Sequence, residues 1–205
     1  MKLNERAWAG QIISWIKQSI NDGTTLFEEA TNDEGIKLAS GKTKFPDVLL
    51  FIDKISGVVF NGWELKFPDT EADDNDMLEN ALEKAEKLKS NSFVTWNGTE
   101  AIIWKIEDNN YTISGLEKLK IYPKEKDITN RNDLADRNNY NKHEAKLQKR
   151  LNEILHDLEQ LYKSGELKQA INISGNFVTS VRAAAAIILP QFKEEIIKLK
   201  GANAS

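Results

Sequence analysis

Three side chains that can do metal-assisted chemistry, Asp47, Glu64 and Lys66, lie near the two ends of an apolar stretch at residues 45–67. β-Branched and aromatic residues predict a strand on each side of a short turn, Lys54-Ile55-Ser56-Gly57. If the hairpin folds symmetrically about the centre of this turn, Asp47 faces Glu64. Two carboxylates then lie side by side on one face of the sheet, with β-carbons about 4.5–5.5 Å apart.

Like charges at that separation destabilise a sheet, and a divalent cation that takes oxygens from both carboxylates relieves the repulsion. Lys66 follows Glu64 by two residues and points to the same side, about 6.6 Å further along the strand. The alternative is that these charges only solvate the strand ends. The metal hypothesis depends on the pairing register, because a slip of one residue moves Asp47 to the opposite face. Gly62 is the position where a bulge could cause such a slip.

The elements before this hairpin supply further acidic residues. Asn4 can cap a helix that runs to about Ile20, with Glu5 in its first turn. Glu5 either complements the helix dipole or leans inward, because it shares a face with the apolar residues of the helix. A strand is predicted at residues 24–30, where Glu28 and Glu29 face opposite sides, so that one of them can approach the carboxylate pair.

The elements after the hairpin alternate between helix and strand patterns. The sequence predicts a helix at residues 77–89, a hairpin of strands 92–96 and 101–106 around an Asn97-Gly98 type I′ turn, edge strands at 111–114 and 118–122, and helices at 140–162, 176–189 and 191–200. We therefore expect an α/β fold with a central mixed sheet flanked by helices at residues 1–123. Residues 124–205 are expected to form a C-terminal helical extension or connector.

Basic residues gather in two places and are candidates for binding a phosphate backbone. Lys37, Lys42 and Lys44 precede the hairpin, and Lys142, Lys146, Lys149 and Arg150 lie near the start of the long helix. Residues 1–119 carry 13 Lys and Arg against 21 Asp and Glu, whereas residues 120–205 carry 15 against 11. The first part therefore favours cations and the second polyanions. The alternative for both groups is an ordinary solvated surface.

Composition excludes several classes of site. The chain has no Cys, which rules out disulfides, thiol nucleophiles and cysteine-based metal centres. The two histidines are too few and too far along the chain from the carboxylates for a histidine-based nuclease site, and no Walker loop, Ser-His-Asp set or dinucleotide fingerprint is present. No apolar run approaches a membrane span, and we expect a cytoplasmic protein.

The order of elements over residues 3–106, with Pro46-Asp47 and Glu64-Leu65-Lys66 at the hairpin ends, resembles the PD-(D/E)XK nuclease superfamily. The resemblance implies a restriction endonuclease-like core in which Asp47 and Glu64 bind Mg²⁺, or Mn²⁺ as a substitute, together with the backbone carbonyl of Leu65. It implies that Lys66 orients or activates the attacking water. A further acidic ligand would be Glu5, with Glu28 as second choice.

The function that this resemblance implies is a Mg²⁺-dependent DNA endonuclease, a phosphodiester hydrolase of a restriction-modification or defence system. Its partners would be DNA and a methyltransferase or specificity module, fused or separate, and a dimer on DNA would let it cut both strands. Two alternatives are a catalytically inactive DNA-binding or assembly module of the same fold, and a DNA repair or junction nuclease.

Overall fold

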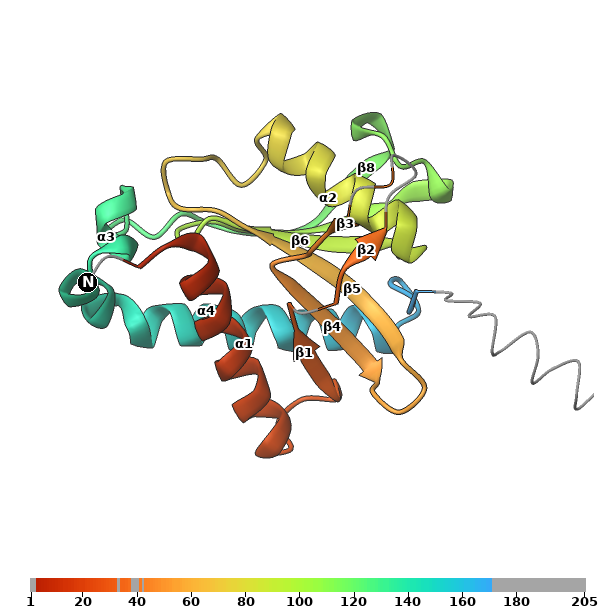
Figure 1. Cartoon of the computed structure of the whole chain (residues 1–205), viewed down its shortest axis with the longest axis horizontal. Coiled ribbons are helices and arrows are strands. Elements are labelled where there is room, and N and C mark those ends of the chain that lie inside the picture. Colours follow the sequence, from red (N-terminus) through yellow and green to blue (C-terminus); the bar gives the residue numbers. More distant parts are fainter. Residues whose placement is uncertain (1–2, 33, 38–40, 42, 171–205) are drawn as a thin grey trace, which may run out of the picture. The chain divides into compact units, whose positions relative to one another are not determined.

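The computed structural model describes residues 3–32, 34–37, 41 and 43–170 (Figure 1). The chain divides into two compact units, Met1–Ile171 and Asn172–Ser205, and the second lies outside the described residues. The helices predicted at residues 176–189 and 191–200 therefore also lie outside them.

A mixed six-stranded sheet forms the centre of the first unit. Its strand order is β1 (Glu29–Thr31), β4 (Val48–Asp53), β5 (Val58–Leu65), β6 (Ser92–Trp96), β7 (Ala101–Ile106) and β8 (Leu116–Tyr122). Only β5 and β6 pair in parallel, because α2 connects them, and the other neighbours are antiparallel. A separate two-stranded sheet pairs β2 (Ile36–Lys37) with β3 (Thr43–Lys44). The predicted α/β class with a mixed sheet is confirmed.

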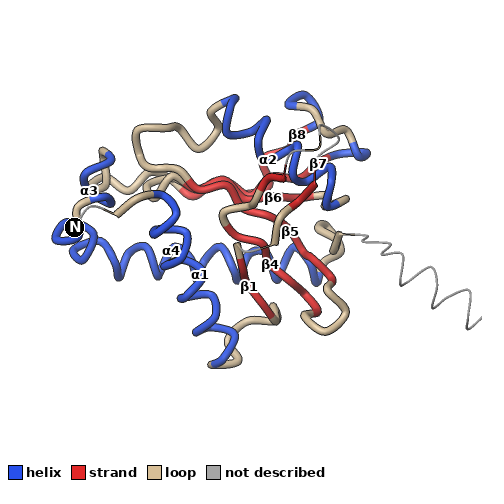
Figure 2. Tube along the Cα trace, in the orientation of Figure 1, coloured by secondary structure: helices blue, strands red, loops and turns tan. Residues whose placement is uncertain are grey.

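Helices cover both faces of this sheet (Figures 1 and 2). They are α1 (Glu5–Asn21), α2 (Asn75–Leu88), the short α3 (Arg131–Ala135) and the long α4 (Arg137–Lys163), with 3₁₀ turns η1 (Glu107–Asn109) and η2 (Ile113–Gly115). Side chains of α1 and α4 share one core with the lower face of the sheet, and α2 packs on the opposite face against β6 and β7. Glu5 of α1 and Lys84 of α2 both reach the end of the sheet where β4 begins and β5 ends.

Helix α1 begins at the predicted cap and buries the predicted face. The Asn4 side chain accepts a hydrogen bond from the Ala7 N–H at 2.8 Å, which satisfies one of the free amides of the first turn. Trp8, Ile12 and Ile16 are fully buried, as their spacing of four residues requires. Glu5 is thereby fixed at the end of the helix that lies nearest the predicted carboxylate pair.

Three predicted elements differ from the structure. The strand predicted at residues 24–30 shortens to β1, and residues 111–114 contribute to the 3₁₀ turn η2 instead of a strand. The hairpin of β6 and β7 forms, but Trp96 pairs with Ala101 across a four-residue loop and not across a type I′ turn. The Asn97 side chain accepts the N–H groups of Thr99 and Glu100, and this side-chain cap favours the wider loop.

Residues beyond 123 take part in the core. The expected boundary between residues 123 and 124 falls inside the first compact unit, because α4 buries Leu147, Leu151, Ile154 and Leu158 in the same cluster as α1 and the sheet. The apolar side of this helix is therefore covered by the chain itself. Within the described residues, no helix combines the length and the apolar character needed to cross a bilayer.

Candidate functional site

The open end of the β4–β5 hairpin, which we call the hairpin mouth, holds Asp47 and Glu64 in the predicted register. Val48 pairs with Trp63 and Leu49 with Gly62, and the Asp47 N–H donates to the Trp63 carbonyl oxygen at 3.1 Å. Gly62 is regularly paired and causes no slip. The irregularity lies further along at Phe51, and Asp53 again faces Val58 as predicted. Asp47 and Glu64 consequently share one face of the sheet.

Asp47 is half-buried and is held by its neighbour on β5. Its Oδ2 accepts a hydrogen bond from the Leu65 N–H at 2.8 Å. Burial and the nearby charge of Glu64 raise the pKa of Asp47 to about 6, although the Leu65 hydrogen bond and the charges of Lys84 and Lys66 oppose the shift. A carboxylate whose charge is disfavoured by both its surroundings and a second carboxylate favours a bound cation.

Glu64 is buried, with 5% of its surface exposed, and contacts two lysines. Its Oε2 accepts a short hydrogen bond from Lys84 Nζ of α2, and its Oε1 lies 3.8 Å from Lys66 Nζ. Lys84 is itself only 7% exposed. Two buried opposite charges in contact neutralise each other, so Glu64 is held toward α2.

Sequence reasoning did not identify Lys84, although a signal was present. The apolar stripe of α2 contains Ala81, Leu82, Ala85 and Leu88, and Lys84 falls inside that stripe. A lysine on a buried helix face needs a charged partner, because burying an unpaired ammonium is costly. The partner in this fold is the Glu64 carboxylate.

Lys66 links α1 to Glu64 at the hairpin mouth. Its Nζ lies 3.4 Å from Glu5 Oε2 of α1, in addition to its contact with Glu64. Burial lowers the pKa of Lys66, but the charges of Glu64, Glu5 and Asp47 outweigh burial and the net shift is upward. Lys66 is therefore a stable cation at neutral pH, with 28% of its side chain exposed.

Aromatic packing beneath the mouth fixes the backbone of Lys66. The Lys66 N–H donates to the Trp96 carbonyl oxygen at 3.1 Å, and the flanking Leu65 and Phe67 are fully buried. The Trp8 ring lies 6.1 Å from Phe67 and 5.4 Å from Trp96, measured between ring centroids. The backbone of Lys66 is thus held in place, which limits the positions that its ammonium group can reach.

Glu28 lies at the other end of the hairpin. Its backbone N–H donates to the Phe51 carbonyl, and its Oε2 accepts the Lys54 N–H at 2.9 Å. Phe51 is four residues from Asp47, which corresponds to about 13 Å along a strand. The structure therefore brings Glu5 to the mouth and does not bring Glu28 there. The Leu65 N–H contacts Asp47. The role of the Leu65 carbonyl as a metal ligand stays a prediction.

Of the three lysines predicted to lie ahead of the hairpin, Lys44 is the one whose side chain the structure describes. Its Nζ donates to Asn80 Oδ1 at 2.7 Å and lies 2.6 Å from Glu83 Oε2, so it ties β3 to α2. The side chain of Lys37 and the whole of Lys42 lie outside the described residues. Lys44 has an internal role that competes with phosphate binding.

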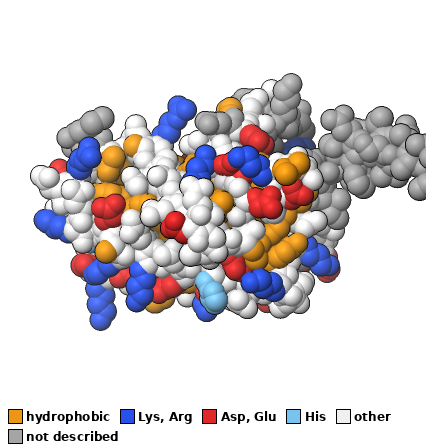
Figure 3. All heavy atoms as spheres, turned by 90° about the horizontal axis from the view of Figure 1, so that it is seen from below, with side chains coloured by type: hydrophobic (Ala, Val, Ile, Leu, Met, Phe, Trp, Pro, Cys, Tyr) orange, Lys and Arg blue, Asp and Glu red, His pale blue; other side chains and the backbone are white. Residues whose placement is uncertain are grey.

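The basic residues at the start of α4 are also engaged within the chain. Lys146 pairs with Asp127 at 2.5 Å, Arg150 pairs with Glu125 at 2.7 Å, and Lys142 donates to Asn139. Lys149 has 79% of its side chain exposed and lies 3.9 Å from Glu153. Figure 3 shows the lower face of the molecule, where Lys and Arg side chains alternate with Asp and Glu. The predicted basic stripe is therefore interrupted by acidic partners.

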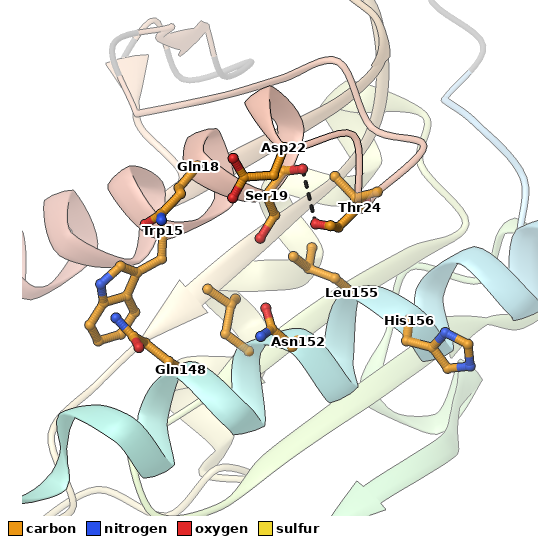
Figure 4. Close-up of a pocket in the computed structure, with 11 residues that line it drawn as sticks. Trp15, Gln18, Ser19, Asp22, Thr24, Gln148, Asn152, Leu155 and His156 are labelled. Atoms are coloured by element: carbon orange, nitrogen blue, oxygen red, sulfur yellow. Dashed lines mark hydrogen bonds between the residues drawn. The ribbon is translucent and has the colours of Figure 1, made fainter.

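A polar pocket of about 460 Å³ lies between α1 and α4 (Figure 4). Gln18 and Ser19 of α1 and Asp22, which follows the helix, border it on one side, and Gln148 and Asn152 of α4 on the other. It is formed by the C-terminal end of the 17-residue helix α1, whereas Glu5 lies at the N-terminal end, about 25 Å away along the helix axis. This pocket is thus separate from the hairpin mouth.

A second open pocket, of about 430 Å³, adjoins the mouth and includes Glu5 and Asp47 in its wall. Within the described residues, no group of three or more His, Cys, Asp or Glu side chains is arranged to hold a metal ion. The mouth offers two neighbouring carboxylates, a third carboxylate paired with Lys66, and two lysines. No protein-family model, curated protein or solved structure matches this chain.

Proposed function

We propose that this chain is a divalent-metal-dependent nuclease that hydrolyses phosphodiester bonds in DNA, with the hairpin mouth as its active site and a restriction endonuclease-like core. The observation that carries the proposal is the meeting of Asp47, Glu64 and Lys66 on one face of the sheet in the register that such chemistry requires. The arrangement joins oxygen ligands to a fixed cation, and phosphoryl transfer needs both.

The residues of the mouth fit Mg²⁺, with Mn²⁺ as a substitute. Mg²⁺ prefers oxygen ligands and is commonly held by one or two carboxylates, with water and substrate phosphate as the remaining ligands. Asp47 and Glu64 would hold it, with the Leu65 carbonyl as a further ligand. The raised pKa of Asp47 supports this fit, because burial and the nearby charge of Glu64 both disfavour its anion, which a bound cation would stabilise. A bound cation would supply Lewis-acid stabilisation of the phosphoryl oxygens.

The protein's own side chains have distinct tasks in this scheme. Lys66 would direct its positive charge at the scissile phosphate and orient the attacking water, because its ammonium is protonated and partly exposed. Glu5 would keep that ammonium at the mouth through its contact at 3.4 Å. Lys84 would fix the position of the Glu64 carboxylate through their ion pair on the α2 side of the mouth.

The biological setting belongs to the same proposal. A DNA endonuclease with this core would act in restriction-modification or another defence system, together with a methyltransferase or specificity module. Cutting both strands would require two active sites and therefore a dimer on DNA.

The test compares Lys66→Ala with Lys54→Ala, a matched change of an exposed lysine at the other end of the same hairpin. Plasmid, duplex and single-stranded DNA are incubated with each protein in Mg²⁺, Mn²⁺ or EDTA. We expect the wild type and Lys54→Ala to cleave only with metal, and Lys66→Ala to lose at least about 100-fold in rate with an unchanged thermal midpoint. Cleavage by Lys66→Ala at the wild-type rate would reject the proposal.

A catalytically inactive DNA-binding or assembly module is the second candidate, and the Lys84–Glu64 ion pair favours it. Lys84 neutralises Glu64 without any metal, as a structural ion pair would. Isothermal titration calorimetry with Mn²⁺ separates the two. A nuclease binds Mn²⁺ and loses this binding on Asp47→Asn, whereas an inactive module binds DNA, shows no Mn²⁺ heat and cleaves nothing.

A further inference from the structure

The pocket beside Asp47 has the size and the side chains of a nucleotide subsite. It has a volume of about 430 Å³ and is bordered by Glu5, Arg6, Asn32, Phe45, Pro46 and Asp47. Glu5 and Asp47 belong to the hairpin mouth, so whatever fills the pocket lies next to the reacting phosphate of the proposed nuclease. The inference below rests on that proposed function and concerns the form of DNA that it takes.

Phe45 is about half exposed and lies on the wall of this pocket. The residue is 51% exposed, and it is the only aromatic residue among the exposed large hydrophobic side chains of the described segments. One edge of its ring approaches Gly35, where a β-carbon would lie 3.0 Å from Cε1 and Cζ of the ring. The absence of a side chain at Gly35 therefore leaves room for the ring. A ring held in this way offers a stacking surface for a base.

Arg6 supplies a positive charge on the wall of the same pocket. It is exposed and forms no ion pair with another described residue, in contrast to the neighbouring Glu5, which contacts Lys66. A guanidinium presents several donors in one plane and binds phosphate oxygens in a bidentate manner. Arg6 and Phe45 together match the phosphate and the base of a nucleotide, and the Asn32 amide can bond to a base edge or sugar.

The geometry favours an unpaired nucleotide over a duplex. In a duplex both faces of each base are covered by neighbouring bases, so Phe45 can stack only on a base that has left the helix or was never paired. A duplex also needs a row of free cations along its backbone. Lys44, Lys146 and Arg150 are instead bound to Glu83, Asp127 and Glu125.

We propose that this pocket binds an unpaired nucleotide adjacent to the scissile phosphodiester, with the base stacked on Phe45 and a phosphate on Arg6. Single-stranded DNA, including the unpaired strand of a flap or splayed end, is then the preferred substrate. Duplex DNA enters the site only where its strands separate.

Binding is measured first, in EDTA, so that cleavage plays no part. Fluorescence anisotropy gives the affinity of each protein for a labelled oligothymidylate and for a blunt hairpin duplex. The wild type should bind the single strand at least about tenfold more tightly. Phe45→Ala should remove about tenfold of that affinity, and Phe45→Trp should keep it. Arg6→Ala should weaken binding and lower the slope of log affinity against log salt by about one unit.

Ile121→Ala is the matched control, because Ile121 is 52% exposed, close to the value for Phe45, and lies in β8 away from the pocket. It should bind as the wild type does. Equal affinity of the wild type for both DNAs, binding to neither, or unchanged single-strand binding by both Phe45→Ala and Arg6→Ala would overturn the inference.

Cleavage separates this inference from the proposed function. Lys66-dependent cleavage of a blunt duplex at least as fast as of a single strand overturns the nucleotide subsite and leaves the nuclease in place. If Phe45→Ala binds single strands as tightly as the wild type does, and Lys66→Ala also cleaves normally, both the nucleotide subsite and the nuclease are overturned. Preferential, Lys66-dependent cleavage of single strands or flaps, reduced about tenfold in Phe45→Ala at subsaturating DNA, supports the subsite.

Discussion

The two ends of the β4–β5 hairpin carry the same kinds of residues in opposite surroundings. At the turn end, Glu29 pairs with Lys54 at 2.6 Å and with Lys17 at 3.1 Å, and the hydrogen bond from Lys54 is the main reason that the pKa of Glu29 is lowered. At the mouth, burial and the charge of Glu64 raise the pKa of Asp47 to about 6. The surroundings therefore favour the charged carboxylate at the turn end and disfavour it at the mouth.

Packing around the charges explains this difference. The turn reaches into water, where Ile55 is 96% exposed, and flexible lysines can approach the carboxylates freely. The mouth lies between α1 and α2 over the Trp8, Phe67 and Trp96 rings, where Asp47 is removed from water and the lysines Lys84 and Lys66 contact Glu64. A carboxylate beside a lysine is thus a poor indicator of a functional site unless burial also shifts the pKa of that carboxylate.

Exchanging one carboxylate at each end gives the largest expected contrast. Glu64→Gln should reduce metal-dependent DNA cleavage by about 1,000-fold, or about 4 kcal/mol in transition-state stabilisation, because it removes a charged ligand. Glu29→Gln should cleave at the wild-type rate. Initial rates on labelled DNA in Mg²⁺ give the comparison, and circular dichroism checks that both variants are folded. Equal rates for the two variants would remove the distinction between the hairpin ends.

Removing one lysine at each end tests which ion pair is structural. Lys84→Met should lower the free energy of unfolding by about 3 kcal/mol in EDTA, because it leaves Glu64 buried without its closest counterion. Lys17→Met, whose ammonium is half exposed, should cost less than about 0.5 kcal/mol. Both values come from urea unfolding.

Adding Mn²⁺ sharpens this second test. If a cation binds at Glu64 in the proposed manner, Mn²⁺ should restore more stability to Lys84→Met than it adds to the wild type. An equal metal effect on the two proteins would argue that the ion is not held by Glu64.

The pH dependence of stability should give the smallest effect, and this effect should have opposite signs at the two ends of the hairpin. Since the folded state raises the pKa of Asp47 from 3.8 to about 6, folded protein holds a proton that the unfolded chain releases. Wild-type stability should therefore fall by about 2 kcal/mol as the pH rises from about 4 to 7 in EDTA. Asp47→Asn should lack this fall and be the more stable protein at pH 8, but not at pH 3.5.

Asp53→Asn provides the opposite case at the turn end. Hydrogen bonds from Ser56 lower the pKa of Asp53, so its charged form favours folding once the pH is above the unfolded pKa. This variant should lose stability at pH 8 and match the wild type at low pH. Urea midpoints measured across the pH range decide both cases, and a parallel pH response of the two variants would contradict the assignment of opposite shifts.

The register of the mouth was predictable from the sequence because turn length and apolar pattern together allow few pairings. Pro46 marks the strand entrance, and the turn at residues 54–57 sets the facing positions. The Asn4 cap and the buried face of α1 follow from local rules in the same way. Glu5 was expected near the carboxylate pair as one option among several acidic residues, and its contact with Lys66 was not predicted.

Contacts across large sequence distances were not predictable in this way. Lys44 meets Glu83 and Arg150 meets Glu125 because tertiary packing brings separate elements together, and spacing along the chain carries no sign of those pairs. The same holds for α4, whose apolar side was assigned to an extension and is buried against the core. Lys84 is an intermediate case. Its position in an apolar stripe indicates that it needs a charged partner, but not which residue that partner is.

The irregular pairing at Phe51 has a consequence for engineering the chain. The strands pair in one register at the mouth, shift at Phe51, and return to that register at Asp53. Such a bulge can absorb a change of length without passing it along the sheet. Residues 54–57 therefore offer an insertion point for a peptide tag or a reporter domain, where added chain is taken up before it can displace Asp47 from Glu64.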